Sequence, residues 1–291
     1  DSVRGGQYRL ASDQALTEVD NSSANLQSFD ADGFTVGTLI NDNQNSVTYV
    51  GWNWKAGGAA VSNSNGSITS SVSASTKAGF SIVGYTGTGA NATVGHGLSS
   101  APELIIVKRR DNGSGATSWK TGSSLLTSWT YRLKLNDTND QNSESDVFND
   151  TAPTNTVFSL GTDVMVNGSG GTFISYCFHS VPGYSKVGSY VGNGNADGTF
   201  VYTGFRPAWV MIKKTSASAN WILIDAERST FNLADDRLSP NATSTEADSN
   251  GIDMLSNGFK IRSTDAQTST SGATFIYLAF AEAPFKFANA R

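Results

Sequence analysis

The sequence is poor in the residues that most often carry chemistry or cross-link a small protein. It has one cysteine, Cys177, and two histidines, His96 and His179, among 291 residues. A single cysteine excludes a disulfide within the chain, and two histidines far apart in the sequence offer no zinc-binding motif. Only 15% of the residues are charged, whereas roughly 25% is usual for globular proteins.

Positive charge and long apolar runs are also scarce. The formal net charge is −5, and the densest basic cluster is Lys108-Arg109-Arg110. This cluster follows an apolar run, and we interpret it as the solvated end of a strand rather than as a nucleic-acid contact. No run of about 18 apolar residues exists. We therefore expect neither nucleic acid nor an inserted membrane segment among the partners of this protein.

Glycine and aromatic residues are plentiful and indicate the fold class. Thirty Gly against six Pro, with fifteen Phe, nine Tyr and six Trp, is typical of short strands joined by many turns. Helical periodicity is nearly absent, and its best candidate is a single turn at residues 233–238. The sequence predicts an all-β fold with tandem antiparallel β-sandwich domains, of jelly-roll or concanavalin-like type, and almost no helix.

An internal repeat organises the chain. The motif at residues 84–89 recurs at residues 189–194, an offset of 105 residues that also aligns Lys108 with Lys213. Residues 170–178 match residues 272–280, an offset of 102 residues, so the middle loop of the second copy is shorter.

The N-terminal region matches only the back half of a unit. Residues 32–36 and 48–54 resemble residues 257–261 and 274–280, and the pair Asp1 and Arg4 falls where Asp225 and Arg228 fall. We expect the front half of this first unit to be supplied by a longer gene product or by another chain. The predicted organisation is a truncated repeat at 1–57, a linker at 58–78, a first full repeat at 79–183 and a second at 184–291.

The closing segment of each unit alternates apolar and polar residues, which predicts a strand with one buried face. The expected inward sets are Val50, Trp52 and Trp54, then Ile174, Tyr176 and Phe178, then Ile276, Leu278 and Phe280. Two continuous apolar runs, at residues 104–107 and 209–212, predict central strands that are covered on both sides.

No candidate for catalysis recurs between the copies. His96 and His179 have no histidine at the matching positions, and Cys177 matches Ala279, so we assign all three to packing. The glycine-rich segments at 87–89 and 192–194 lie between strand-like sequences and are interpreted as β-turns rather than phosphate loops. We predict that the protein is not an enzyme, with no catalytic residues and no cofactor.

Acidic residues suggest two further interpretations. Asp137, Asp140, Asp146 and Asp150 form an acidic loop that could bind Ca²⁺, although a solvated loop without metal is the favoured interpretation. Asp163 and Asp265 match between the copies, and we expect their carboxylates to cap turns.

One recurring pair leaves a binding site open as an alternative. Asp225 with Arg228, repeated as Asp1 with Arg4, is expected to form an ion pair that fixes the middle loop. A carbohydrate site is the functional alternative, in which Trp119, Trp129 and Trp221 would stack on sugar rings beside Asp225 and Arg228. Specific binding is expected in the unlike middle loops, near residues 111–155 and 225–253.

Several phrases of the sequence resemble repeat domains in virion and tail-fibre-type proteins of marine tailed bacteriophages, including cyanophage-like ones. They are found at residues 79–89, 94–98, 105–108, 204–210, 255–260 and 282–286. The similarity extends over essentially the whole chain and carries no catalytic residues to transfer.

The resemblance implies a virion structural protein on the particle surface, either a tail-fibre or receptor-binding component or a capsid-surface fibre, that attaches to host-surface glycans. It also implies contacts with other virion proteins and a homo-oligomer, with a trimer favoured for a fibre. The alternatives are a secreted bacterial carbohydrate-binding or adhesion protein and, less favoured, a glycan-degrading enzyme.

Overall fold

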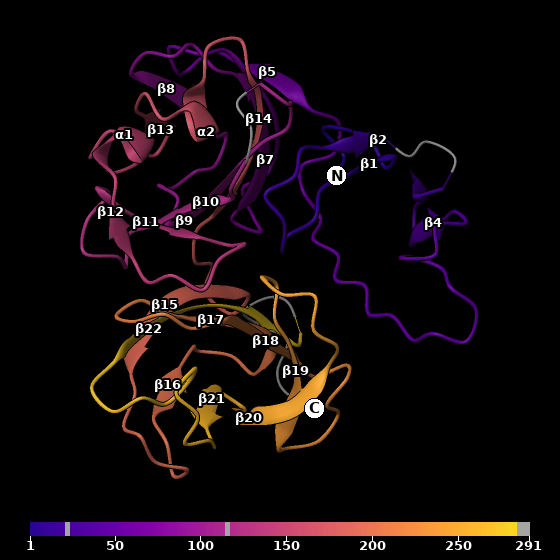
Figure 1. The fold of residues 1–291 in the computed structure, drawn as a ribbon, viewed down its shortest axis with the longest axis vertical. Helices are drawn as coiled ribbons and strands as arrows, with labels where there is room; N and C mark the ends of the chain where they lie inside the picture. Colours follow the sequence, from indigo (N-terminus) through magenta and orange to yellow (C-terminus); the bar gives the residue numbers. More distant parts are fainter. Residues whose placement is uncertain (21–23, 114–116, 284–291) are drawn as a thin grey trace.

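The computed structural model describes residues 1–20, 24–113 and 117–283, so most of the closing motif at residues 282–286 lies outside the described residues. Two eight-stranded antiparallel sheets dominate the structure. Figure 1 shows three parts around a common centre: the first copy, the second copy and the N-terminal region. The prediction of an all-β fold built from tandem antiparallel units is confirmed, because only two helices, α1 (Ser145–Phe148) and α2 (Val164–Asn167), occur among the described residues.

The first sheet belongs to the first copy and has β9, β14 and β7 at its middle. Its order is β12 (Asn142–Ser143), β11 (Tyr131–Lys134), β10 (Lys120–Ser123), β9 (Leu104–Arg109), β14 (Thr172–Phe178), β7 (Phe80–Thr86), β6 (Ser70–Ser75) and β5 (Val61–Asn63). One face is covered by the pair β8 (Ala92–Gly95) and β13 (Val157–Leu160) and by the two short helices, which share an apolar cluster with it.

The second sheet belongs to the second copy and curls until its ends approach each other. Its order is β15 (Ser185–Val191), β22 (Thr274–Ala281), β17 (Pro207–Lys214), β18 (Trp221–Asp225), β19 (Ala234–Leu238), β20 (Ala247–Leu255), β21 (Gly258–Ile261) and β16 (Phe200–Tyr202). The nine-residue β20 pairs with both β19 and β21. Through this pairing the second copy forms one continuous sheet. The first copy instead has two separate sheets, the eight-stranded sheet and the pair β8 and β13, and the region that corresponds to β20 holds only β12 and α1.

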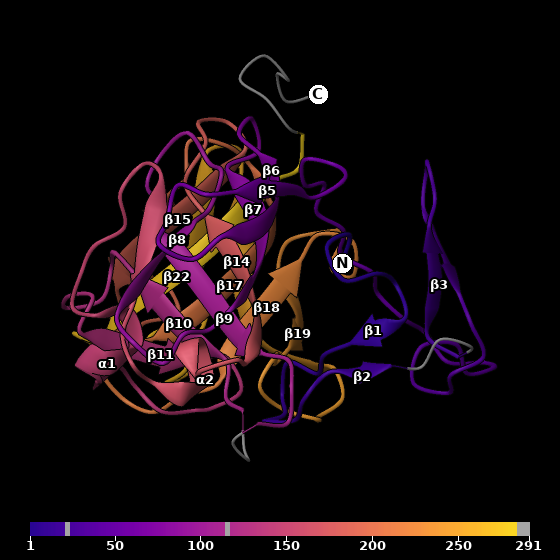
Figure 2. The ribbon, with the colours of Figure 1, turned by 90° about the horizontal axis from the view of Figure 1, so that it is seen from above.

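The N-terminal region forms two small hairpins and a long extended segment. The strand β1 (Tyr8–Arg9) pairs with β2 (Val19–Asp20), and β3 (Leu26–Phe29) pairs with β4 (Phe34–Val36). Residues 47–57, which match β14 and β22 in sequence, contain no strand. Figure 2 shows β3 standing away from the rest of the molecule. We call residues 1–57 the half-unit.

The two large sheets share a central apolar cluster, and this cluster decides how the copies are joined. It combines Ile174 and Phe178 of β14 with Ile276, Leu278 and Phe280 of β22, and Trp52 and Trp54 of the half-unit pack against it. The opposite faces of the same strands are also buried, because Phe173 and Cys177 face the core of the first copy and Phe275 and Ala279 that of the second. The prediction of one buried face per closing strand is therefore wrong for the full copies, since each closing strand separates two cores.

Two predictions about local structure are also wrong. The predicted linker at 58–78 contains β5 and β6, which pair with each other and with β7, so its Ser and Thr residues extend the first sheet. The predicted helical turn at 233–238 is the strand β19, because pairing with β18 and β20 overrides the weak helical pattern. The central strands expected at residues 104–107 and 209–212 are confirmed as β9 and β17, each of which lies between two neighbours.

The glycine-rich segments are the predicted β-turns. Gly89 and Gly194 occupy matching positions after β7 and β15 and have φ angles of 75° and 69°. Only glycine adopts this left-handed conformation without strain, so the two turns require it. Among the described residues, no helix combines the length and the apolar character that crossing a membrane requires.

The central cluster predicts a stability difference between two phenylalanines. Phe280→Ala should lower the free energy of unfolding by about 3–5 kcal/mol, because it removes a buried ring that contacts Trp54, Phe178 and Trp209. The matched control Phe200→Ala removes an exposed ring and should change it by less than about 0.5 kcal/mol. Urea unfolding followed by circular dichroism measures both, and equal losses would contradict a shared central core.

Candidate functional site

The interactions that recur from unit to unit lie where the units meet. Each unit contains an Arg-Leu pair followed by a segment of backbone acceptors, which we call the acceptor segment. The acceptor segments are residues 11–15, 134–138 and 239–243, each directly after the Arg-Leu pair at 9–10, 132–133 or 237–238. The two full copies each also contain a buried lysine on one strand and a tryptophan at the start of the next strand or directly before it, which we call the Lys–Trp anchor. The anchors are Lys108 with Trp119 and Lys213 with Trp221.

Each tryptophan donates a hydrogen bond to the acceptor segment of the preceding unit. The Trp119 Nε1–H donates to the Ala11 carbonyl at 2.9 Å, and the Trp221 Nε1–H donates to the Lys134 carbonyl at 2.9 Å. Ala11 and Lys134 hold the same position after the Arg-Leu pair. The first copy is therefore joined to the half-unit in the way that the second copy is joined to the first.

Backbone hydrogen bonds extend both contacts in the same register. The Thr117 N–H donates to Ala15 O at 3.0 Å, and the Ala219 N–H donates to Thr138 O at 2.8 Å. Three residues further on, the Glu18 N–H donates to Arg110 O and the Gln141 N–H donates to Thr215 O. Since all of these pairs match between the two contacts, the docking geometry is a property of the repeat.

The lysine of each anchor is fully buried, and no carboxylate among the described residues pairs with it. Lys213 Nζ donates to Thr138 O at 2.8 Å and to Ala219 O at 2.5 Å, and Lys108 Nζ donates to the carbonyl and hydroxyl of Thr117. The ammonium groups lie 5.9 Å and 5.4 Å from the Trp221 and Trp119 rings. Burial lowers the pKa of both lysines to about 8. Lys213 thus ties the loop before Trp221 directly to Thr138, whereas Lys108 holds Thr117, whose hydroxyl donates to the Ala15 and Leu16 carbonyls.

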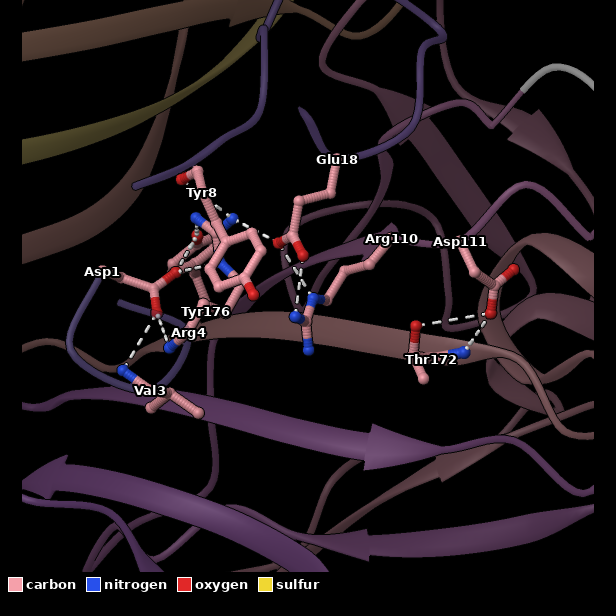
Figure 3. A network of polar contacts seen from close by, with 9 residues as sticks. All are labelled: Asp1, Val3, Arg4, Tyr8, Glu18, Arg110, Asp111, Thr172 and Tyr176. Atoms are coloured by element: carbon pink, nitrogen blue, oxygen red, sulfur yellow. Dashed lines mark hydrogen bonds and ion pairs between the residues drawn. The ribbon is translucent and has the colours of Figure 1, made fainter. Parts of the chain in front are cut away.

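An ion-pair network reinforces the contact between the half-unit and the first copy (Figure 3). Glu18 accepts two hydrogen bonds from Arg110, at 2.9 Å and 2.8 Å, and one from Arg4 at 2.6 Å. Arg4 also pairs with Asp1 at 2.6 Å, and the Tyr176 hydroxyl donates to Asp1 at 2.8 Å. Burial alone would raise the pKa of Glu18, but the hydrogen bonds from Arg110 and Arg4 lower it overall. The carboxylate therefore stays ionised in this interface.

The second copy repeats part of this network against the half-unit. Arg228 pairs with Asp225 and Glu246, both at 2.7 Å, and its guanidinium lies 5.7 Å from the Trp52 ring. The expected Asp–Arg ion pair is thus confirmed, although each arginine divides its donors between two carboxylates. Trp52 of the half-unit matches Tyr176 of the first copy. Arg4 of the half-unit therefore contacts the first copy at the position where Arg228 of the second copy contacts the half-unit.

A second buried network holds the first copy together internally. Lys120 pairs with Glu144 and, at 2.8 Å, with Asp163, and Arg132 also pairs with Glu144. The hydrogen bond from Arg132 is the main reason that the pKa of Glu144 falls to about 2.

The expected turn-capping by Asp163 and Asp265 is confirmed, since they accept from the backbone N–H groups of Met165 and Gln267.

The proposed carbohydrate residues do not form an accessible site in this structure. Trp119, Trp129, Trp221 and Asp225 are buried, and Arg228 is largely engaged by carboxylates. A stacking platform requires an exposed ring face, whereas these indoles fill cores between strands or anchor one unit to the next. The interpretation of Lys108-Arg109-Arg110 as a solvated strand end is also wrong. Lys108 and Arg109 are buried, and Arg110 is bound by Glu18.

The histidines and the cysteine have the expected packing roles. Burial lowers the pKa of His96, whose ring nitrogens contact Thr154 O and the Leu98 N–H. His179 Nδ1 lies 2.9 Å from Ser180 O. Burial raises the pKa of the Cys177 thiol to about 12, so a reactive thiolate is not available there at neutral pH.

In the acidic loop, the carboxylates of Asp137 and Asp150 have different partners. Asp137 accepts from Asn139, Asp150 accepts from Thr130, and the Asp146 carbonyl accepts from Gly161 and Asp163. Across the described parts of the chain, no three His, Cys, Asp or Glu side chains are grouped so that they could hold a metal ion. The structure therefore offers no support for the Ca²⁺ alternative.

Sequence reasoning missed the acceptor segments and the anchoring role of the tryptophans. A signal was present, because Tyr-Arg-Leu at residues 8–10 recurs at residues 131–133, and Asn136 and Asn241 both follow at a matching distance. These two asparagines cap the backbone N–H groups of Trp119 and Trp221 at 2.8 Å. The pairing of a tryptophan with a segment of another unit, however, was not encoded in any local spacing.

Comparisons with known proteins give one family match. A family model described as "Domain of unknown function (DUF7483)" matches residues 1–284. No curated protein and no solved structure matches the chain.

The indole hydrogen bond can be separated from the ring packing. Trp221→Phe should lower the free energy of unfolding by about 1 kcal/mol more than Trp209→Phe, because both lose similar ring volume but only Trp221 donates a hydrogen bond. Urea unfolding of the two variants and the wild type measures the difference. Equal losses would show that the hydrogen bond to Lys134 contributes nothing.

The Glu18 network predicts that stability depends on pH. The lowered pKa of Glu18 means that its stabilising contribution is present above its ordinary pKa of about 4.5 and is lost as the pH falls through the lowered value. Glu18→Gln should therefore lower stability at pH 7 by about 2 kcal/mol and flatten the decline below pH 4.5. Glu246→Gln, at the matching but exposed position, should have a smaller effect. Unfolding midpoints from pH 7 to pH 3 test both variants, and identical profiles would contradict the assignment.

Proposed function

The chain belongs to the family described as domain of unknown function DUF7483, and we propose that it is a structural component of a bacteriophage particle. In this proposal it lies on the virion surface, as a tail-fibre, receptor-binding or capsid-surface fibre component, and attaches the particle to host-surface glycans. The observation that carries the proposal is the repeated docking of like units through Lys–Trp anchors and acceptor segments. Such contacts build a rigid assembly from repeated modules, as an appendage requires.

The distribution of recurring residues supports a role in assembly rather than in catalysis. The features shared between the units are the anchors, the Asp–Arg pairs and the central aromatic positions. An enzyme needs a reactive group with an acid or base beside it, and the residues that differ between the copies include both histidines and the cysteine. The phrases that resemble tail-fibre-type repeat domains agree with this proposal.

Attachment to a glycan is assigned to the exposed middle loop of the second copy. Phe231 is 84% exposed in the segment between β18 and β19, which lies within the loop region where specific binding was expected. An exposed aromatic ring flanked by polar residues can stack on a sugar ring, whereas the buried tryptophans cannot. This loop therefore replaces Trp119, Trp129 and Trp221 as the candidate receptor contact.

Self-association is part of the same proposal, with a trimer favoured for a fibre. The strand β16 forms one edge of the second sheet and carries the exposed rings of Phe200 and Tyr202. An unpaired edge with exposed aromatic side chains suits a contact with a second copy or with another virion protein.

The proposal predicts that the chain is present in purified particles and binds the cells that those particles infect. Mass spectrometry of virions should detect it, and labelled protein should bind host cells in flow cytometry. Phe231→Ser should reduce cell binding at least about fivefold, whereas the matched control Phe29→Ser, which removes another exposed ring in the half-unit, should not. Absence from particles, together with recovery in the culture medium of uninfected bacteria, would overturn the proposal in favour of a secreted adhesin.

A further inference from the structure

The contacts between the three parts follow a cycle with one incomplete step. The anchor of the first copy docks on the half-unit, and the anchor of the second copy docks on the first. The matching residues Trp54, Phe178 and Phe280 belong to the three parts, and Phe280 contacts both of the others, with ring centroids 5.5 Å and 6.2 Å apart. The half-unit packs against the second copy through Trp52 and Trp54, but this third contact has no Lys–Trp anchor.

The half-unit exposes positions that are core residues in the second copy. Phe34 is 41% exposed, whereas its match Phe259 is completely buried, and Tyr49 is 50% exposed, whereas its match Phe275 is completely buried. Within the described residues, seven of the fourteen exposed large hydrophobic side chains belong to residues 1–57. In the second copy, the corresponding positions are covered by the front half, β15 to β18. Its strands β15 and β17 lie on either side of β22.

The second copy has an acceptor segment to which no other unit donates a hydrogen bond within the described residues. The carbonyl of Thr243, which matches Ala15 and Thr138, accepts no hydrogen bond from the described residues, and Ser239 O accepts only from Ala242 in its own turn. Glu246 is 46% exposed, whereas its match Glu18 is 10% exposed because Arg4 and Arg110 bind it. Thr243 and Glu246 are thus exposed here, whereas Ser239 is buried.

Two buried indole groups mark the same incomplete contact. The Nε1 atoms of Trp52 and Trp209 are buried and have no hydrogen-bond partner among the described residues, whereas the indoles of Trp119 and Trp221 donate to neighbouring units. A buried polar group without a partner costs about 1–3 kcal/mol. Both rings lie where the half-unit packs against the second copy, with ring centroids 6.5 Å apart.

We infer that the half-unit and the acceptor segment at residues 239–243 together form a binding site for the front half of one more unit. The occupant is a four-stranded polypeptide segment with the pattern of residues 184–224. Two of its strands would flank residues 48–54, as β15 and β17 flank β22, and its Lys–Trp anchor would dock on Ser239 and Thr243. Asp1 matches Asp225, the last residue of β18.

A second copy of this chain is a poorer occupant. Both of its front halves are already paired with their own closing strands, β14 and β22, through continuous hydrogen-bonded ladders. Releasing one of them would expose the core that it covers, at a cost comparable to the gain. An additional front half has no such competing partner, so it fits the site at lower cost.

The test is to join residues 184–224 directly to Asp1, which reproduces the junction between Ile224 and Asp225. Hydrogen exchange should slow at least about tenfold for the amides of residues 32–36 and 48–54, because these residues gain strand partners or cover. The thermal midpoint should rise by several degrees. The matched control is the same fusion with Trp221→Ala in the added copy only, which should lose most of the gain.

A second arm keeps the test decisive if the fusion folds poorly. A synthetic peptide of residues 184–224, added to the unfused chain, should protect the same amides, and the Trp221→Ala peptide should not. The inference is overturned if neither the fusion nor the peptide protects residues 32–54, or if the variant protects them equally. It is also overturned if the unfused chain sediments as a dimer with these amides already protected, since a second copy would then be the occupant.

Discussion

The structure depends on closing strands that are buried on both faces. In β14 and β22, alternate side chains enter the core of their own copy, and the side chains between them enter the central cluster shared with the other copy. Apolar burial stabilises by about 25 cal/mol per Å², so a strand that buries both faces contributes to two cores at once. The two copies are therefore not independent domains joined by a flexible linker. The face that each copy would expose on its own is buried in the interface between them.

The Lys–Trp anchors give this packing a direction. Apolar contact alone tolerates sliding between sheets, whereas a hydrogen bond from an indole to one carbonyl of the neighbouring unit sets a single register. The buried lysine adds to this effect, since an ammonium without a carboxylate partner must have several carbonyls in place around it. The same geometry recurs in two contacts, and the tryptophan always acts on the preceding unit, so the contacts are head to tail.

The half-unit contains less strand than either full copy. Its closing segment, with Trp52 and Trp54, reaches the central cluster, yet it forms no strand and pairs with no strand among the described residues. Its first hairpin, β1–β2, is joined to the first copy through Glu18 and the acceptor segment, whereas β3 stands away from the rest of the molecule. Side chains of residues 51–57 still alternate between more exposed and more buried positions although they form no strand, because packing against one apolar surface is enough to orient them.

The amino-acid sequence by itself determined the class of secondary structure, the repeat with its offsets, the central strands β9 and β17, the glycine turns and the structural roles of His96, His179 and Cys177. These features follow from local conformational preference and from comparing one unit with another. Tertiary structure alone decided that the linker is part of a sheet, that both faces of the closing strands are buried, and that Trp119 and Trp221 are anchors rather than sugar platforms. An aromatic side chain has the same local pattern whether its ring meets solvent, a sugar or a neighbouring unit. Only the positions of residues about a hundred apart in the chain settle which of these surrounds it.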